Sequence, residues 1–266
     1  MDLRATFDEN AERYEQFRPR YPTQLFDKLV ADAGINSNSS LLEIGPGTGQ
    51  ATKPLAKLGS AITAIELGAS LAQKARQELR QYDNVRIITG SFEDINLPAS
   101  NYDLIYSATA FHWVKNEYQF TKTARLLKPH GYLAIIHTTH VSDENGDRFH
   151  RASQSIYDTY WPPKDTSSPP VLPAVHEVKA PYVDTALFGL QSFMVFPQIK
   201  TYTAHDYAGL VSTYSPTLAL PPSKRKNFLA AIEKLINEQF NGKLEKRFAF
   251  SLAVARKIQN KTANPF

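Results

Sequence analysis

Cysteine is absent from this chain of 266 residues, and methionine and tryptophan occur only twice each. The lack of cysteine excludes disulfide bonds, cysteine-ligated metals, iron–sulfur chemistry and any mechanism that uses a cysteine nucleophile. Runs of about 18 apolar residues are also missing, as is a charged N-terminal segment followed by an apolar one. The sequence therefore predicts a cytoplasmic protein that makes no contact with a membrane.

A strong charge of one sign is missing as well. Lysine and arginine number 30 against 26 aspartates and glutamates, which gives a net charge of +4. This modest excess permits an anionic substrate but is a weak sign of nucleic-acid binding, so we expect no nucleic-acid partner. The length fits one domain with a single sizeable core.

The segment LLEIGPGTGQ, residues 41–50, is the most informative part of the chain. Its apolar start is typical of a strand buried on both faces, and helical spacing resumes near Gln50. Between them, Gly45, Gly47 and Gly49 permit positive φ angles and a close approach of ligand to backbone. Such a turn predicts a site for a small-molecule cofactor.

The glycine spacing helps to choose between cofactors. A dinucleotide site typically has G-x-G-x-x-G, and here its third glycine would fall on Gln50. Glu43 would be a poor neighbour for a pyrophosphate, whereas it suits a cofactor with an ammonium and a sulfonium group. Alternatively, Glu43 accepts hydrogen bonds from nearby backbone amides. Glu66, at the end of the segment AITAIE, fits the ribose of either S-adenosylmethionine or NAD.

Strands and helices alternate up to His137. This alternation predicts an α/β fold with a doubly wound, mostly parallel sheet, whose ligands collect at the carboxyl ends of the strands. The expected strands cover residues 41–44, 61–66, 85–90, 102–108 and 131–137, and the expected helices begin near residue 50 and cover about 70–81 and 117–127.

The alternation of strands and helices ends after residue 137. Residues 138–186 are polar, aromatic and rich in proline, which predicts a cap over the substrate side with a short helix near 146–160. Beyond the cap we expect a strand within 190–203, helices near 204–213 and 223–240, and a last strand over 246–257, making seven strands in all. A basic run at 224–226 fits a solvated first turn of the second helix.

Five segments resemble the motifs of class I S-adenosylmethionine-dependent methyltransferases, in the order that the family has them. They are LLEIGPGTG, AIELGASLAQKA, VRIITGSFEDI, YDLIYSATAFHWV and LLKPHGYLAII. The resemblance implies a Rossmann-like methyltransferase that takes S-adenosyl-L-methionine and releases S-adenosyl-L-homocysteine. It also implies one domain over 1–266, made of an N-terminal lid (1–22), a cofactor-binding half (23–137), the cap (138–186) and a part that completes the sheet (187–266).

The resemblance assigns roles to particular residues. Glu43 would sit near the amino group of the cofactor, Glu66 would hold the ribose and Leu67 would pack on the adenine. The other residues implied to touch the cofactor near these three are Gly45, Pro46, Gly47, Gly49, Gln50, Ala108 and Thr109.

The adenine contact departs from the family pattern. Ser91 stands where many relatives have an aspartate, so the backbone of Phe92 and the side chain of Glu93 are the expected substitutes. Ser91 to Asp94 could also form a capping turn for a short helix.

The N-terminal segment places Phe7, Ala11, Tyr14 and either Phe17 or Arg18 on one helical face before Pro19. In relatives with a similar opening this segment folds over the cofactor, which makes Tyr14, Arg18 and Tyr21 candidate partners for the methionine carboxylate. The alternative is an amphipathic helix on the sheet with Arg18 in solvent.

The acceptor is expected beside Phe111, His112 and Trp113, which follow the fourth strand. His112 is the candidate general base, and Trp113 and Phe111 are expected to line the acceptor; a structural histidine is the alternative reading. His137 and His140 have weaker claims, and their spacing fits no metal motif, so we expect no metal.

The acceptor itself is left open. The stretch AFHWV and the segment 212–216 resemble a broad group that includes trans-aconitate-type carboxyl and ubiquinone-biosynthesis-type carbon methyltransferases. A D-P-P-Y type of loop is missing, which argues against methylation of a flipped base. We expect in-line transfer to a carboxylate, hydroxyl or activated carbon of a small molecule, by a monomer or homodimer. The alternatives are a non-catalytic adenosylmethionine-binding protein or a nicotinamide-dependent oxidoreductase.

Overall fold

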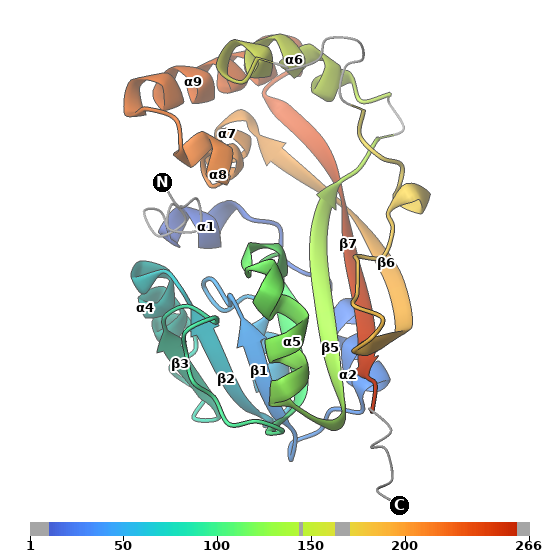
Figure 1. The fold of residues 1–266 in the computed structure, drawn as a ribbon. Coiled ribbons are helices and arrows are strands. Elements are labelled where there is room, and N and C mark those ends of the chain that lie inside the picture. Colours follow the sequence, from blue (N-terminus) through green and yellow to red (C-terminus); the bar gives the residue numbers. More distant parts are fainter. Residues whose placement is uncertain (1–10, 144–145, 163–170, 260–266) are drawn as a thin grey trace, which may run out of the picture. The chain divides into compact units, whose positions relative to one another are not determined.

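The computed structural model describes residues 11–143, 146–162 and 171–259. Its central element is a seven-stranded sheet in the order β3-β2-β1-β4-β5-β7-β6 (Figure 1). The strands are β1 (Ser40–Ile44), β2 (Ala61–Glu66), β3 (Val85–Thr89), β4 (Tyr102–Ala108), β5 (Leu127–His140), β6 (Phe188–Thr203) and β7 (Lys243–Lys257).

The first five strands are parallel. β1 pairs with β2 and β4, β2 also pairs with β3, and β4 also pairs with β5, while β7 runs antiparallel to β5 (Figure 1). The chain therefore leaves β1 in one direction for β2 and β3 and in the other for β4 and β5. The predicted doubly wound, mostly parallel sheet is confirmed, and its order reverses at β1, where ligands of this fold class bind.

The helices follow the predicted alternation closely. They are α1 (Ala11–Phe17), α2 (Thr23–Ala33), α3 (Thr52–Ala56), α4 (Ala69–Glu78), α5 (Asn116–Leu126), α6 (Arg148–Tyr160), α7 (Ala204–Ser212), α8 (Ser215–Leu218) and α9 (Pro222–Gln239), with 3-10 turns η2 (Phe111–Trp113) and η3 (Val175–Glu177). The strands expected at 61–66 and 102–108 have the predicted bounds, and α6 confirms the short helix in the cap.

Some predicted bounds were wrong. The fifth strand, predicted over 131–137, begins at Leu127 and ends at His140, so both His137 and His140 lie inside it. The early start has a local cause, because Pro129 disfavours helix at the residue before it. Helix α2 was not predicted, although its buried Leu25 and Leu29 have helical spacing.

The residues form two compact units. Unit 1 comprises Met1–Arg20, Thr138–Val178 and Phe196–Phe250, and unit 2 comprises Tyr21–His137, Lys179–Val195 and Ser251–Phe266. Most of the predicted lid and cap thus belong to the same unit, apart from residues 1–10, 144–145 and 163–170, which lie outside the described residues. The single domain over 1–266 stays a prediction.

Unit 2 carries the parallel strands and the glycine turn. Leu42 and Ile44 of β1 pack in one core with Phe120 and Ala124 of α5. Side chains alternate along a strand, so Glu43 points to the opposite face. Figure 1 shows α5 in front of the strands and α2 behind them, as a doubly wound sheet requires.

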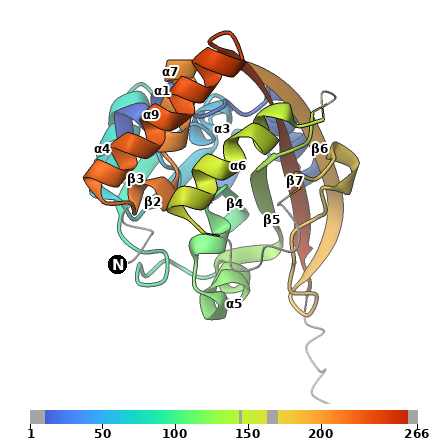
Figure 2. The same cartoon turned by 90° about the horizontal axis from the view of Figure 1, so that it is seen from above.

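Unit 1 is held together by its helices. Helix α7 contacts α1 and α9, and α9 lies along α6 (Figure 2). Phe17 of α1 packs directly on Gly209 of α7, where an added Cβ would come within 2.6 Å of the ring. Beside it, Arg13 Nη1 donates to Ser212 Oγ at 3.3 Å.

Candidate functional site

The glycine turn after β1 has the backbone that the sequence predicts. The φ angles of Gly45, Gly47 and Gly49 are 68°, 59° and 91°, all in the region that favours glycine. A Cβ at Gly45 would lie 2.5 Å from Cβ of Ala110, and one at Gly49 would lie 2.7 Å from Cδ1 of Leu79. At Gly45 the missing side chain is therefore required by the packing against Ala110, whereas at Gly49 an added Cβ would force the end of the Leu79 side chain to move.

Glu66 ties the glycine turn to the end of β2. The Gly47 N–H donates to Oε2 of Glu66 at 2.9 Å, and the Gly68 N–H donates to Oε1 at 3.0 Å. A carboxylate oxygen accepts more than one hydrogen bond, so this role is compatible with a contact to ribose hydroxyls. Leu67, the next residue, is 38% exposed at the same edge.

Glu43 is completely buried beneath the turn. Thr52 Oγ1 donates to its Oε2 at 2.5 Å and the Tyr106 hydroxyl at 2.8 Å, so its donors are hydroxyls and not backbone amides. Its other oxygen, Oε1, has no hydrogen-bond partner among the described residues. Burial raises the pKa of Glu43 to about 7, even though the two donors oppose the shift.

The segment after β3 forms a local network of hydrogen bonds. Ser91 Oγ donates to Oε2 of Glu93 at 2.5 Å, the Glu93 N–H donates back to Ser91 Oγ at 3.1 Å, and the Lys115 N–H donates to Oε1 of Glu93. Phe92 is buried. Residues 92–94 form a turn and no helix follows over residues 95–101, so the alternative of a capping turn for a short helix is wrong.

The end of β4 lies beside the same edge of unit 2. Ala108 is buried, and Thr109 has a φ of 59°, an uncommon conformation for a β-branched residue. Its N–H donates to the Ile136 carbonyl at 2.7 Å. The Tyr21 hydroxyl lies 3.1 Å from Thr109 Oγ1, which brings the predicted residue Tyr21 to the predicted cofactor edge.

The predicted acceptor residues lie on η2. The ring of His112 is 4.9 Å from that of Trp113 and stacks on His137 at 5.7 Å. Burial lowers the pKa of His112 and of His137, so both rings are neutral near pH 7. Phe111 is buried in the core against Phe120, and its lining of an acceptor stays a prediction.

Tyr14 and Arg18 belong to unit 1. Arg18 donates through Nε to Thr213 Oγ1 and through Nη2 to the Thr213 carbonyl, both at 2.9 Å. Its Cζ lies 5.0 Å from the ring of Tyr14 and 4.5 Å from that of Tyr214. Arg18 is therefore not a solvated arginine. In the sequence, segment 212–216 is notable only for its resemblance to a group of methyltransferases. The contact of Thr213 with Arg18 was not predicted, because no local pattern pairs the two.

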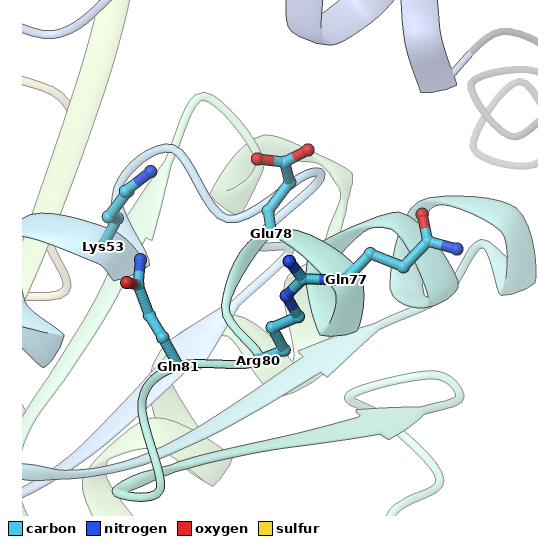
Figure 3. Close-up of a pocket in the computed structure, with 5 residues that line it drawn as sticks. All are labelled: Lys53, Gln77, Glu78, Arg80 and Gln81. Carbon is cyan, nitrogen blue, oxygen red and sulfur yellow. The ribbon is translucent and has the colours of Figure 1, made fainter.

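A cavity of about 650 Å³ lies between α3 and the end of α4 (Figure 3). The residues that line it are Lys53, Gln77, Glu78, Arg80 and Gln81. None of them was predicted to bind a ligand, and their charges are mixed. We assign this cavity no role in the reaction.

The described ranges contain neither a candidate membrane-spanning helix nor a candidate metal site. No helix there combines the length and the apolar character that crossing a bilayer requires. Within the same ranges, no group of three or more histidine or carboxylate side chains is placed to hold a metal ion.

Comparison with known proteins agrees with the geometry. The methyltransferase domain family matches residues 42–135, which include the glycine turn, Glu66 and η2. An uncharacterised methyltransferase of Schizosaccharomyces pombe is 27% identical over 232 residues, covering 87% of this chain and 87% of the relative.

Solved structures share the fold. A protein of Anaeromyxobacter dehalogenans described as a type II methyltransferase has a TM-score of 0.59 at 21% identity, covering 90% of this chain and 97% of its own. A Haemonchus contortus N-methyltransferase, solved with phosphomonomethylethanolamine and S-adenosylhomocysteine, has a TM-score of 0.51 at 12% identity, over 97% of this chain and 61% of its own. The domain match, the relatives and the strand order together support a class I S-adenosylmethionine-dependent methyltransferase.

Proposed function

We propose that this methyltransferase binds S-adenosylmethionine at the carboxyl edge of β1 to β4 and transfers its methyl group to a small organic acceptor. The observation that carries the proposal is Glu43. A completely buried carboxylate oxygen without a described partner is costly unless a donor or a cation meets it. The ammonium and sulfonium groups of this cofactor supply positive charge, whereas the pyrophosphate of NAD would add negative charge.

The surrounding residues suit the other parts of the cofactor. Glu66 already orders the glycine turn and would also accept from the ribose hydroxyls. Leu67 offers exposed apolar surface for the adenine. Around them, the Gly45–Gly49 turn, Ser91, Glu93 and Thr109 would complete the contacts, and Tyr14, Arg18 and Tyr21 remain proposed partners of the methionine carboxylate.

The bound cofactor supplies a methyl group that is already activated on its sulfonium. The residues of the chain then have to align the acceptor and exclude water. Where the acceptor carries a proton into the reaction, His112 is the proposed base, because its lowered pKa keeps it neutral and able to accept one near pH 7. A carboxylate acceptor needs no base.

Calorimetry with adenosylhomocysteine and with NAD tests the cofactor. We expect adenosylhomocysteine to bind and NAD not to bind. Glu66→Gln should weaken the binding of adenosylhomocysteine by about 1.5 to 3 kcal/mol, since it replaces an ionised hydrogen-bond acceptor with a neutral one. Glu117→Gln, on the exposed start of α5, is the matched control and should bind normally.

Tight NAD binding without any response to adenosylhomocysteine would overturn the proposal. Release of adenosylhomocysteine on incubation with a panel of acceptors then separates an active enzyme from a binding protein without turnover.

A further inference from the structure

The two oxygens of the Glu43 carboxyl group have unequal surroundings. Both hydroxyl donors, Thr52 Oγ1 at 2.5 Å and the Tyr106 hydroxyl at 2.8 Å, donate to the same oxygen, Oε2. The other oxygen, Oε1, is buried and has no hydrogen-bond partner among the described residues. All three residues belong to unit 2, so one compact body defines their mutual geometry.

Two different elements of the fold bring these donors to Glu43. Tyr106 is paired with Glu43 where β4 runs parallel to β1, so both side chains lie on one face of the sheet. Thr52 is the first residue of α3, directly after the glycine turn. Thr52 and Tyr106 are both completely buried. The carboxyl group is therefore fixed through Oε2, while Oε1 is left unbonded.

The electrostatic surroundings of Glu43 lack a positive charge. The titratable groups that act on it are Tyr106 and Glu66, and Glu66 is a second buried carboxylate, at the end of β2. Burial raises the pKa of Glu43 to about 7, the charge of Glu66 adds to the shift, and the two hydroxyl donors oppose it. A cation that meets Oε1 would lower this pKa again, because it favours the ionised carboxylate.

The hydrogen bonds also indicate which oxygen carries the proton when Glu43 is neutral. A carbonyl oxygen has two lone pairs, and the two hydroxyls occupy both of them on Oε2. The proton therefore belongs on Oε1, the oxygen without a partner. A cation and this proton compete for the same atom, so the binding of the one is linked to the loss of the other.

We propose that Thr52 and Tyr106 are positioning residues, which hold Glu43 so that Oε1 pairs with the ammonium group of the cofactor, and that this pairing expels a proton. The proposal rests on the proposed function, because the ammonium belongs to S-adenosylmethionine. On binding, the O–H bond at Oε1 breaks, the proton passes to water, and the carboxylate pairs with the ammonium. Cofactor affinity is therefore regulated by pH.

Isothermal calorimetry of the full chain with adenosylhomocysteine, in two buffers of different ionisation enthalpy, measures both the affinity and the protons released. The wild type should release about half a proton at pH 7, and its affinity should rise about tenfold from pH 6 to pH 8. Glu43→Gln should bind more weakly, with no proton release and no such rise. An equal wild-type affinity at pH 6 and pH 8 would overturn the proposal.

Tyr106→Phe and Thr52→Val test the positioning role. Each removes a donor that favours the ionised carboxylate, so Glu43 should keep its proton to a higher pH. Either variant should bind adenosylhomocysteine at least about fivefold more weakly than the wild type at pH 7, and within about twofold at pH 9. Equal losses at both pH values would mean that the hydroxyls are merely structural, and would overturn the role.

Matched controls are available in unit 2. Tyr102→Phe changes a buried tyrosine of the same strand, and Thr123→Val removes a buried hydroxyl that donates to the Gln119 carbonyl on α5. Neither hydroxyl bonds to Glu43. Both variants should therefore keep the affinity of the wild type at pH 7 and pH 9, within about twofold.

A second measurement needs no ligand. Urea unfolding compares Tyr106→Phe with the double variant that also carries Glu43→Gln, over a series of pH values. The pH at which their stability difference levels off should be about one unit higher than for the wild type and Glu43→Gln. An unchanged pH would show that Tyr106 does not set the ionisation of Glu43, and would overturn its assignment.

The two proposals fail differently. If the wild type does not bind adenosylhomocysteine at any pH, the proposed cofactor is refuted, and the pairing at Oε1 is refuted with it. If adenosylhomocysteine binds tightly without proton release or pH dependence, the proposed cofactor stands. Only the role assigned to Glu43, Thr52 and Tyr106 is then refuted.

Discussion

Glu43 is held entirely out of water and yet keeps a hydrogen-bonding pattern suited to its ionised form. Its folded pKa of about 7 exceeds the ordinary value of 4.5, so the folded protein retains a proton that the unfolded chain releases. This proton contributes to the free energy of unfolding in full below a pH of about 4.5, and the contribution is lost as the pH rises from about 4.5 to about 7.

The wild type should therefore lose stability relative to Glu43→Gln over that pH range, by on the order of 2 to 3 kcal/mol. Urea unfolding at pH 5, 6, 7 and 8 measures the free energy of unfolding of each protein. The contributions of the other titrating groups cancel in the difference between the two proteins. A constant difference across the four pH values would show that Glu43 is already ionised throughout.

Gly45 illustrates how one position combines backbone and packing demands. Gly45→Ala has to adopt a φ of 68° and also places its Cβ 2.5 Å from that of Ala110. Gly34→Ala, after α2, has to adopt a φ of 63° but meets nothing within 4 Å. The second substitution is thus a matched control for backbone strain alone.

We expect Gly34→Ala to cost about 1 kcal/mol of stability, and Gly45→Ala to cost about 1 to 3 kcal/mol more because the loop has to shift. Denaturant unfolding of the two variants checks this. Equal losses would mean that the Ala110 segment yields without cost.

At the scale of elements, α1 and α7 are joined at a glycine. Gly209 lies inside α7, where alanine would ordinarily stabilise a helix by about 0.5 to 1 kcal/mol. Here the added Cβ would come within 2.6 Å of the Phe17 ring, so the sign should reverse. We expect Gly209→Ala to destabilise the protein by about 1 to 3 kcal/mol.

A double-mutant cycle with Phe17→Ala measures the contact. Once the ring is gone, Gly209→Ala should become neutral or stabilising, which gives a coupling of about 1 to 3 kcal/mol. Additive effects of the two substitutions would contradict the direct contact between α1 and α7.

The elements themselves were largely predictable. The strand β1 follows from a short apolar run before Gly45, and α6 was expected as a short helix inside the proline-rich cap. What failed were some boundaries and two helices: β5 begins at Leu127, earlier than predicted, and neither α2 nor the four-residue α8 was predicted. Periodicity needs more residues than α8 provides.

For the whole molecule, we still expect the N-terminal segment and the cap to close over the loaded site, as the resemblance implies. Hydrogen exchange with and without adenosylhomocysteine tests this expectation. Exchange should slow in α1 on binding, because a closing segment loses local openings, and it should change little in α9, which carries no predicted cofactor residue. Identical exchange in α1 with and without the ligand would show that it is no lid.

By itself, the sequence determined the fold class and predicted the methyltransferase resemblance and a cofactor edge in unit 2, because strand, turn and helix signals lie within a few residues of one another. Only the tertiary structure decided which distant residues meet. Arg18 bonds Thr213 across 195 residues, and Tyr202, His140 and Lys246 converge from three strands. It also showed that Oε1 of Glu43 and the Tyr202 hydroxyl lack partners among the described residues. Whether a buried polar atom is satisfied depends on all its neighbours in space, and no local pattern of residues encodes them.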